Sequence, residues 1–440
     1  MDPVTIGALG LVILVALIAI RVPIAYSMIL VGGVGIMILN GPLLVMSQLK
    51  TLAFGVFSNY GLSVVPMFVL MGALASRAGL SHDLFRGANA WLGWMRGGVA
   101  MAAIAACAGF GSVCGSSLAT ASTMGRVALP ELSRYNYAGS LATGTLAAGG
   151  VLGILIPPSV VLVIYAIIVE ANIVTMFMAA FEPGLIAVAF FMITIFIYVT
   201  LRPDSGPPGD AVSRREFFEA TLRVGPVLAI FGLVIGGIYL GFFNPTPAAA
   251  IGVFLVTVYG IVRGAVRVPD MRIALLDTAK TTGMIYLILL GAEMLKIFMS
   301  RGGVPQAAAE MMANSGLAPV TILILLLIAL ILLGCLMDSL SMILLAIPFF
   351  WPVIAELDFG MGAEELKIWF GILALIVVEL GLITPPVGMN VFVISAMAKG
   401  VPMRDTFIGV MPFFVAELLR IGLLVAFPAI ALWLPRLLSG

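Results

Sequence analysis

The sequence predicts an all-α, polytopic membrane protein. Of its 440 residues, 62% are hydrophobic and only 10% are Asp, Glu, Lys or Arg, whereas soluble domains average about 45–50% apolar and about 25% charged residues. A soluble fold could not bury that much apolar surface. The apolar residues come in runs of about 20, the length of a helix that crosses a bilayer. The alternating ten-residue pattern of a membrane β-barrel is absent.

Charge and composition exclude several classes of function. The 22 basic and 21 acidic residues nearly cancel, which argues against a nucleic-acid-binding surface. No CxxC, HExxH or Walker motif is present, so we expect no zinc, haem or iron–sulfur cofactor, no ATP hydrolysis through a P-loop and no enzyme activity. Cys107, Cys114 and Cys335 each lie in an apolar run and are expected to be buried free thiols. The first apolar run lacks a basic leader and a cleavage signal, so we expect a retained span.

The N-terminal half is predicted to hold spans, an amphipathic segment and two broken apolar segments. Its first 39 residues are apolar except for Asp2 and Arg21, and Pro23 favours a turn that divides them, although one long tilted helix also fits. The expected elements are spans at about 4–20, 22–39 and 51–76, an amphipathic segment at 80–96, broken segments at 97–131 and 138–170, and a span at 184–201.

Residues 202–223 are the one clearly polar stretch and are predicted to form a solvated linker. The apolar pattern then starts again. The expected elements are spans at 226–242, 247–263 and 282–300, a broken segment at 318–352 centred on Asp338-Ser339, a broken segment at 369–397 interrupted at Thr384-Pro385-Pro386, and a last span within 407–436. Glu293 and Lys296, three residues apart in one span, are expected to pair on a helix face.

The second half repeats motifs of the first in the same order. Pro23 and Pro247 are 224 residues apart, as are Ser117 and Ser341, and the sequence from Ser76 recurs at Ser300 with the same offset. The sequence Leu-Gly-Ile-Leu-Ile-Pro-Pro at 152–158 recurs as Leu-Gly-Leu-Ile-Thr-Pro-Pro at 380–386. Corresponding broken hydrophobic segments in two halves indicate the binding site of a secondary transporter.

The distribution of charge predicts opposite orientations for the two halves, if 97–131 and 318–352 are re-entrant hairpins. The positive-inside rule places the segment with more basic residues on the cytoplasmic side, which is the first hairpin. Five spans in each half, an odd number, would likewise invert one repeat relative to the other. Around the first hairpin lie Arg77, Arg86, Arg96, Arg126 and Arg134 with Asp83 and Glu131; around the second lie Arg301 and Lys367 with Glu310, Glu356, Asp358, Glu364 and Glu365.

The tips of both hairpins carry candidate ion ligands. Glycines in 109–120 let the backbone leave the helix, so that carbonyls and the hydroxyls of Ser112 and Ser117 can coordinate a hard cation, and the following helix N-terminus suits a carboxylate. At the second tip Asp338 is flanked by apolar runs, and a carboxylate at membrane depth indicates function. A bound sodium ion would neutralise the Asp338 carboxylate. The alternative is that this carboxylate carries a proton. The structural alternatives are close helix packing through small residues at the first tip and an aspartate in an aqueous loop at the second.

The two Pro-Pro segments are expected to break their helices, because proline removes a backbone donor and clashes with the preceding turn. Non-helical backbone within the hydrocarbon layer persists only where it lines a cavity or is buried in protein. A plain proline kink is the alternative. Near the first tip the exposed carbonyls would be those of Gly153, Ile156 and Pro157; near the second they would be those of Gly381, Thr384 and Pro385, with the amide of Asn390 one turn further on.

Four motifs together resemble the large membrane subunit of tripartite ATP-independent periplasmic (TRAP) transporters, over essentially the whole chain. They are Gly-Ile-Leu-Ile-Pro-Pro-Ser at 153–159, Asn-Pro-Thr-Pro-Ala-Ala-Ala at 244–250, Thr-Thr-Gly-Met at 281–284 and Gly-Leu-Ile-Thr-Pro-Pro-Val-Gly-Met-Asn at 381–390. One departure is Pro247, where the family's Pro-Thr-Glu-Ala-Ala turn has glutamate. That turn lies far from the expected tips, so we expect no change of function.

The resemblance implies a sodium-coupled elevator transporter of the ion-transporter superfamily in the bacterial inner membrane. It implies organic-acid substrates, mostly carboxylates, that a periplasmic substrate-binding protein delivers. A small four-helix membrane subunit is expected as a separate chain, and membrane lipid surrounds both. The resemblance also divides the chain into parts. The scaffold would comprise 1–79 and 226–304, and the two halves of the transport domain would comprise 80–170 and 305–397. A linking span with the polar cytoplasmic linker would occupy 171–225, and a C-terminal span would occupy 398–440.

The resemblance also assigns site residues. The substrate carboxylate would lie between the tips, near Ser116, Thr120 and Asn390. The sodium ligands would be Ser112, Ser117, Gly153 and Pro157 at the first site, and Asp338, Ser339, Ser341, Gly381 and Thr384 at the second. A stand-alone sodium or proton symporter of the same fold is the main alternative. A passive channel is disfavoured because mirrored broken segments favour alternating access.

Overall fold

The computed structural model describes residues 2–210, 212–313 and 316–438, which form 20 α-helices and two short 3-10 helices and contain no strand. The first 39 residues form two helices rather than one long one, because the chain turns at 20–23, where Arg21 has a φ of 68°. The helices of this first part are α1 (Pro3–Ala19), α2 (Ile24–Asn40), α3 (Pro42–Phe57), α4 (Val64–Arg77) and α5 (Leu80–Leu92), with η1 (Tyr60–Ser63) before α4.

The expected span at 51–76 is wrong as a single helix. A helix begins at Pro42 and ends at Phe57, and the chain then turns before η1 and α4. The turn is stabilised locally, because the side chain of Asn59 accepts a hydrogen bond of 2.8 Å from the backbone N–H of Gly61. Polar Ser58 and Asn59 in an otherwise apolar run are the sequence signal for this break.

The two breaks predicted in the first half are confirmed. The segment 97–131 forms α6 (Gly98–Cys114) and α7 (Ser117–Arg134), and 138–170 forms α8 (Gly139–Leu155) and α9 (Val160–Ile168), bent by 48°. The expected span at 184–201 is too short, since α10 runs from Ile173 to Leu201. Asn172 defines its start, because its side chain accepts from the backbone N–H groups of two residues in the first turn.

The polar linker is also shorter than expected, because α11 (Arg214–Tyr239) begins within it. Ser213 and Glu216 form a capping box at the start of that helix, which satisfies two backbone N–H groups. The linker therefore occupies about 202–213 and contains η2 (Pro203–Ser205). The expected spans at 247–263 and 282–300 correspond to α12 (Pro245–Val262) and to α13 (Val268–Gly302), which begins 14 residues earlier than predicted.

In the second half the two predicted breaks are again present. The remaining helices are α14 (Val304–Ala313), α15 (Pro319–Gly334), α16 (Ser339–Ala355), α17 (Ala363–Gly381), α18 (Met389–Met397), α19 (Met403–Ala426) and α20 (Ala429–Leu438). The chain leaves helical geometry between α15 and α16 and between α17 and α18, and it ends in two helices rather than one span. Both broken segments, at 157–158 and 385–386, contain a cis Pro-Pro peptide bond.

Six helical segments in the described part of the chain are long and apolar enough to cross a membrane, and the bent pair α8–α9 would make a seventh. Several other apolar helices, α1, α2, α3, α6, α15 and α16 among them, have only 16 or 17 residues. Large apolar side chains such as Phe54, Phe196 and Leu419 are exposed on the outer surface. An outer surface of this kind is expected to face lipid.

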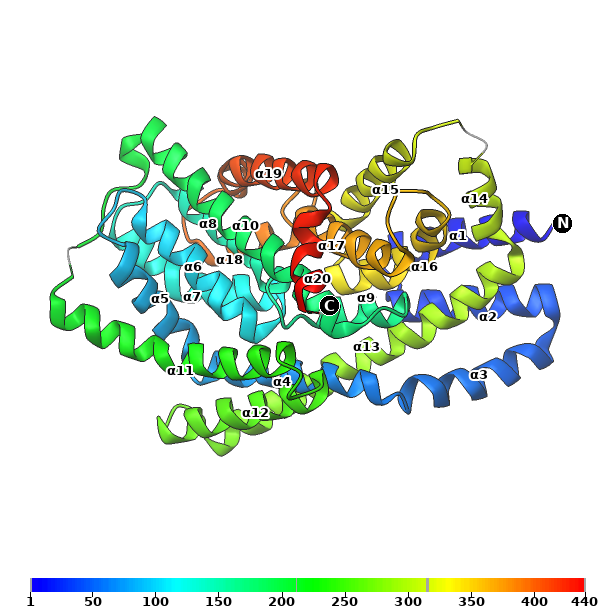
Figure 1. Cartoon of the computed structure of the whole chain (residues 1–440), viewed down its shortest axis with the longest axis horizontal. Helices are drawn as coiled ribbons and strands as arrows, with labels where there is room; N and C mark the ends of the chain where they lie inside the picture. Colours follow the sequence, from blue (N-terminus) through cyan, green and yellow to red (C-terminus); the bar gives the residue numbers. More distant parts are fainter. Residues whose placement is uncertain (1, 211, 314–315, 439–440) are drawn as a thin grey trace.

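The core gathers the broken helices and hairpins of both halves. Figure 1 shows α3, α11, α12 and α13 along one side, with the helices of the α6–α9 and α16–α19 regions together beside them. Helix α8 packs against α6, α7 and α19, while α16 contacts α9 and α18 contacts α7 and α8. The two halves therefore interlock, because elements of the second half pack on the hairpin and broken helix of the first.

Candidate functional site

The two hairpin tips are tight turns between short apolar helices. At the first, Gly115 adopts a φ of 63°, which favours glycine, and Ser116 caps α7 by accepting from the backbone N–H of Ala119. At the second, Asp338 caps α16, because it accepts from the backbone N–H of Ser341 at 3.1 Å and from that residue's hydroxyl at 2.6 Å. Each tip therefore presents the N-terminus of a helix together with hydroxyl or carboxylate oxygens.

A carboxylate that the sequence analysis did not select joins the two tips. Glu379 lies in α17, two residues before its end, and is 0% exposed. The Ser117 hydroxyl donates to its Oε2 at 2.5 Å, and the Ser339 hydroxyl donates to its Oε1. The signal was present, since an acidic residue within an apolar run is a functional candidate by the same rule that selected Asp338.

A cavity of about 960 Å³ opens beside the tips. Ser116, Ser117, Asp338 and Ser339 contribute to its wall from the two tips. The facing wall comes from α4 and α13, among them Ser76, Arg77, Asp277, Thr278 and Thr281. It therefore combines hydroxyl, carboxylate and guanidinium groups with apolar side chains, which is the character of a site for a small polar solute.

Of the sodium ligands expected at the first site, the structure places Gly153 directly against the first tip. Ser112 is buried and its hydroxyl donates to the carbonyl of Gly109 at 2.8 Å, while Pro157 lies in the break between α8 and α9. Gly153 packs directly behind the tip: a Cβ on Gly111 would lie 2.5 Å from the Cα of Gly153. A side chain at either glycine would push the broken helix away from the hairpin.

The second expected sodium site has the same arrangement. A Cβ on Gly381 would lie 2.6 Å from the carbonyl carbon of Gly334, so the broken helix again approaches its hairpin through glycine. Ser341 bonds to Asp338, Ser339 to Glu379, and the Thr384 hydroxyl donates to the carbonyl of Leu380 at 2.6 Å. The hydroxyl oxygens keep lone pairs free after donating, so they remain able to bind a hard cation.

The three residues expected to contact the substrate do not lie together on the cavity wall. Ser116 lines the cavity, whereas Thr120 and Asn390 are buried and do not. Asn390 donates its amide to the carbonyl of Ala147 at 3.3 Å. Its Oδ1 and the Thr120 hydroxyl are buried without a hydrogen-bond partner in the described structure. Both oxygens are therefore available to a water molecule or a cation, and a Cβ on Gly153 would lie 2.4 Å from the Thr120 hydroxyl oxygen.

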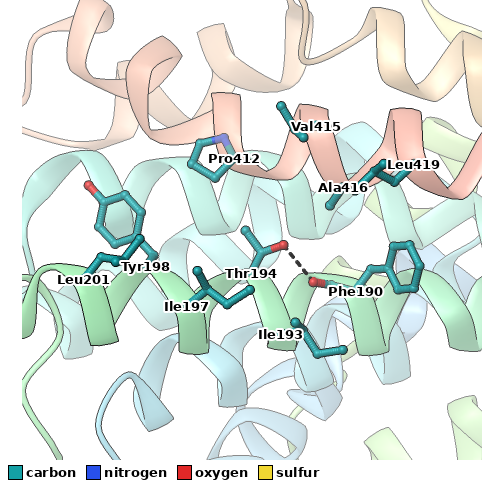
Figure 2. Close-up of a pocket in the computed structure, with 10 residues that line it drawn as sticks. All are labelled: Phe190, Ile193, Thr194, Ile197, Tyr198, Leu201, Pro412, Val415, Ala416 and Leu419. Atoms are coloured by element: carbon teal, nitrogen blue, oxygen red, sulfur yellow. Dashed lines mark hydrogen bonds between the residues drawn. The ribbon is translucent and has the colours of Figure 1, made fainter.

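A second hollow lies away from the tips, on the outer face between α10 and α19. Figure 2 shows that apolar side chains line it, with Thr194 and Tyr198 as its polar members. The hydroxyl of Thr194 donates to the carbonyl of Phe190, and that of Tyr198 bonds to Arg202. The lining of this groove is therefore almost entirely apolar, unlike that of the cavity beside the tips.

Two other expectations concern ordinary packing, and both are confirmed. Glu293 and Lys296 form a salt bridge of 3.9 Å on α13. The three cysteines are buried and free. Within the described residues there is no group of three or more His, Cys, Asp or Glu side chains arranged to hold a metal ion.

The family profile described as "Tripartite ATP-independent periplasmic transporter, DctM component" matches residues 11–430. The chain belongs to the DctM family. Its membership agrees with the broken helices and paired tips just described. A TRAP large permease is a transporter component and not an enzyme, and a multi-pass membrane protein of this family works beside a small membrane subunit and a periplasmic binding protein.

Relatives of known name support the same family. The DctM-family chain is 33% identical over 396 residues to the C4-dicarboxylate TRAP transporter large permease of Pseudomonas aeruginosa, covering 89% of this chain and 91% of that protein. It is 30% identical to the sialic acid TRAP transporter large permease of Vibrio cholerae, covering 88% of each chain. It is also 30% identical to the ectoine TRAP transporter large permease of Halomonas elongata, covering 85% of this chain and 86% of that protein.

A solved structure shares the fold. The YdaH transporter of Alcanivorax borkumensis superposes with a TM-score of 0.62, covering 89% of each chain at 15% sequence identity. At that identity the likeness concerns the arrangement of helices and not the transported solute.

Proposed function

We propose that this DctM-family chain imports an organic acid across the bacterial inner membrane in symport with sodium. The observation that carries the proposal is the cavity whose wall includes both hairpin tips, with hydroxyls from Ser116 and Ser117 on one side and Asp338 on the other. Small hydroxylated and carboxylate-bearing tips offer sodium the hard oxygen ligands it prefers. The relatives named for C4-dicarboxylates and sialic acid support an acidic solute.

Sodium binding would prepare the substrate site. The oxygens of Ser112, Ser117, Gly153 and Pro157 would hold one ion, and those of Asp338, Ser339, Ser341, Gly381 and Thr384 another. A cation beside Asp338 cancels the charge that would otherwise repel an acid in the same cavity. Acid and sodium then favour each other's binding, and that mutual preference is the basis of symport.

The cavity wall also supports an elevator. Hairpins and broken helices interlock, as one moving body would require, while α4 and α13 face them across the cavity. In this scheme the two halves are an inverted repeat, and the body that carries both tips slides past the helices of 1–79 and 226–304. Substrate and ions would then meet water on one side of the membrane at a time.

A periplasmic substrate-binding protein would deliver the acid, and a small four-helix subunit would complete the complex, with the apolar outer surface in contact with lipid. The test is uptake of radiolabelled succinate, a sialic acid or ectoine into liposomes that hold this chain with its small subunit. Uptake should require both an inward sodium gradient and the binding protein. Strong uptake by the chain alone would favour a stand-alone symporter, and uptake that ignores sodium would overturn the coupling.

A further inference from the structure

The charged side chains that line the cavity are not equally paired. Arg77 pairs with Asp277 at 3.4 Å and with Asp270 at 3.9 Å, both from α13. Asp338 is bonded to Ser341. Arg126 also lines the cavity and is exposed there, yet within the described residues no carboxylate lies within 4.0 Å of its guanidinium. It is the cavity's unpaired cation.

Helix geometry directs this guanidinium toward the first tip. Arg126 lies nine residues after Ser117 on α7, which is about 13 Å along the axis. Helical side chains lean toward the N-terminus of their helix, which here is the tip. The observed contact agrees, since an Nη2 donates to the Thr123 hydroxyl, one turn closer to the tip, at 3.4 Å.

The surroundings of Arg126 are polar on one side. The Thr123 hydroxyl lies 3.3 Å from that of Ser76 on α4, so hydroxyl groups from α7 and α4 meet beside the guanidinium. Among the described residues, one long hydrogen bond uses one of the five N–H donors of Arg126. The remaining donors form a planar fork that matches the two oxygens of a carboxylate.

We propose that Arg126 binds the carboxylate of the transported acid, an assignment that rests on the proposed function. Its guanidinium faces the solute cavity and keeps most of its donors available to an anion there. Arg126 therefore selects solutes that carry a carboxylate over their neutral analogues, and Ser116 and the Thr123 hydroxyl complete its side of the cavity. Thr120 and Asn390 would not touch the acid.

The test compares three variants in the reconstituted three-component system. Arg126→Gln removes the charge at similar length, and Arg126→Lys keeps the charge without the fork. Arg96→Gln is the matched control, because Arg96 is exposed and outside the cavity lining. Sodium-driven uptake is measured for succinate, a sialic acid and ectoine. Binding of the best of them to the purified chain is measured by thermal shift, alongside the amide of the same acid.

We expect Arg126→Gln to raise the half-saturating acid concentration at least about tenfold, the effect of losing a hydrogen-bonded charge partner. The half-saturating concentration of Arg126→Lys should lie between those of the wild type and Arg126→Gln, and that of Arg96→Gln should match the wild type. The wild-type preference for acid over amide should also shrink in Arg126→Gln, which a purely structural defect would not cause. Equal acid binding by the wild type and Arg126→Gln would overturn the assignment and leave the proposed function standing. If the wild type takes up no acid, the proposed function fails, and this assignment fails with it.

Discussion

Ser117, at the tip of the first hairpin, donates a hydrogen bond of 2.5 Å to Glu379, which lies 262 positions later in the chain. The other oxygen of the same carboxylate accepts from Ser339, at the tip of the second hairpin. One buried side chain therefore ties together two turns that come from different halves of the sequence. Any movement that separates the tips must break at least one of these bonds.

Replacing Glu379 by glutamine should loosen this junction. The amide keeps one acceptor oxygen but turns its NH2 group toward the other serine, whose hydroxyl must then accept instead of donating to a carboxylate, at a cost of about 1–3 kcal/mol. We expect a lower unfolding temperature of the purified chain and reduced uptake. Glu293→Gln, in the partly exposed pair on α13, is the control and should behave like the wild type. Wild-type stability and uptake in Glu379→Gln would show that the junction is unimportant.

The buried pair Glu417–Arg420 should stabilise the packing of α19 on α10. Both side chains are at most 1% exposed, and Arg420 also donates to the carbonyl of Pro183 at 2.9 Å. Arg420→Met should destabilise the chain by about 3–5 kcal/mol, because it leaves a buried carboxylate unpaired. The double variant with Glu417→Leu should recover much of that loss. Thermal unfolding in detergent measures both, and equal losses in the single and double variants would contradict this account.

The contact of α20 with the start of α17 should weaken in acid. The guanidinium of Arg436 donates to Glu365 at 2.7 and 2.9 Å and lowers the pKa of that carboxyl. Because the folded pKa is lowered, the stabilisation is present above the usual carboxyl pKa and disappears as the pH falls through the lowered value. Both groups are partly exposed, so the effect is below about 1 kcal/mol. The difference in unfolding temperature between the wild type and Arg436→Gln should shrink from pH 7 to about pH 3. An unchanged difference would show that the ion pair between Arg436 and Glu365 does not stabilise this contact.

The inverted arrangement of the halves predicts opposite labelling of two loops. Asp204 in the polar linker and Gly362 before α17 are both exposed, and a Cβ at Gly362 would meet no atom within 4 Å. Single cysteines at these positions are introduced after Cys107, Cys114 and Cys335 are replaced by serine. A membrane-impermeant thiol reagent added to intact cells should label Gly362→Cys and spare Asp204→Cys. Labelling of both from outside would rule out the inversion.

The breaks at the hairpins and at the Pro-Pro motifs were predictable because glycine and proline act locally on the backbone. The start of α11 was less so: Ser213 and Glu216 lie in a run of polar residues, and only their reciprocal capping distinguishes helix from linker. Long-range contacts were harder still. The burial of Thr120 and Asn390 depends on how α18 packs on α7 and α8. The junction at Glu379 joins two tips that are 222 positions apart in the sequence, and a local sequence pattern does not show that they meet.

Sodium activation of the Asp338→Asn variant tests whether sodium bound at the tips drives the uptake of an acid. The change keeps the size of the side chain and its ability to accept from the Ser341 backbone, but it removes the charge that would attract the ion. Ser117→Ala, which removes one neutral oxygen and leaves Glu379 without one donor, should cost less, about 1–3 kcal/mol.

The measurement is uptake against sodium concentration in liposomes that hold the complete transporter, with equal amounts of each variant verified by gel. We expect Asp338→Asn to need a much higher sodium concentration for half-maximal uptake and to reach a lower maximum, while its unfolding temperature stays close to that of the wild type. An unchanged sodium midpoint in Asp338→Asn would show that the second tip does not hold sodium through its carboxylate.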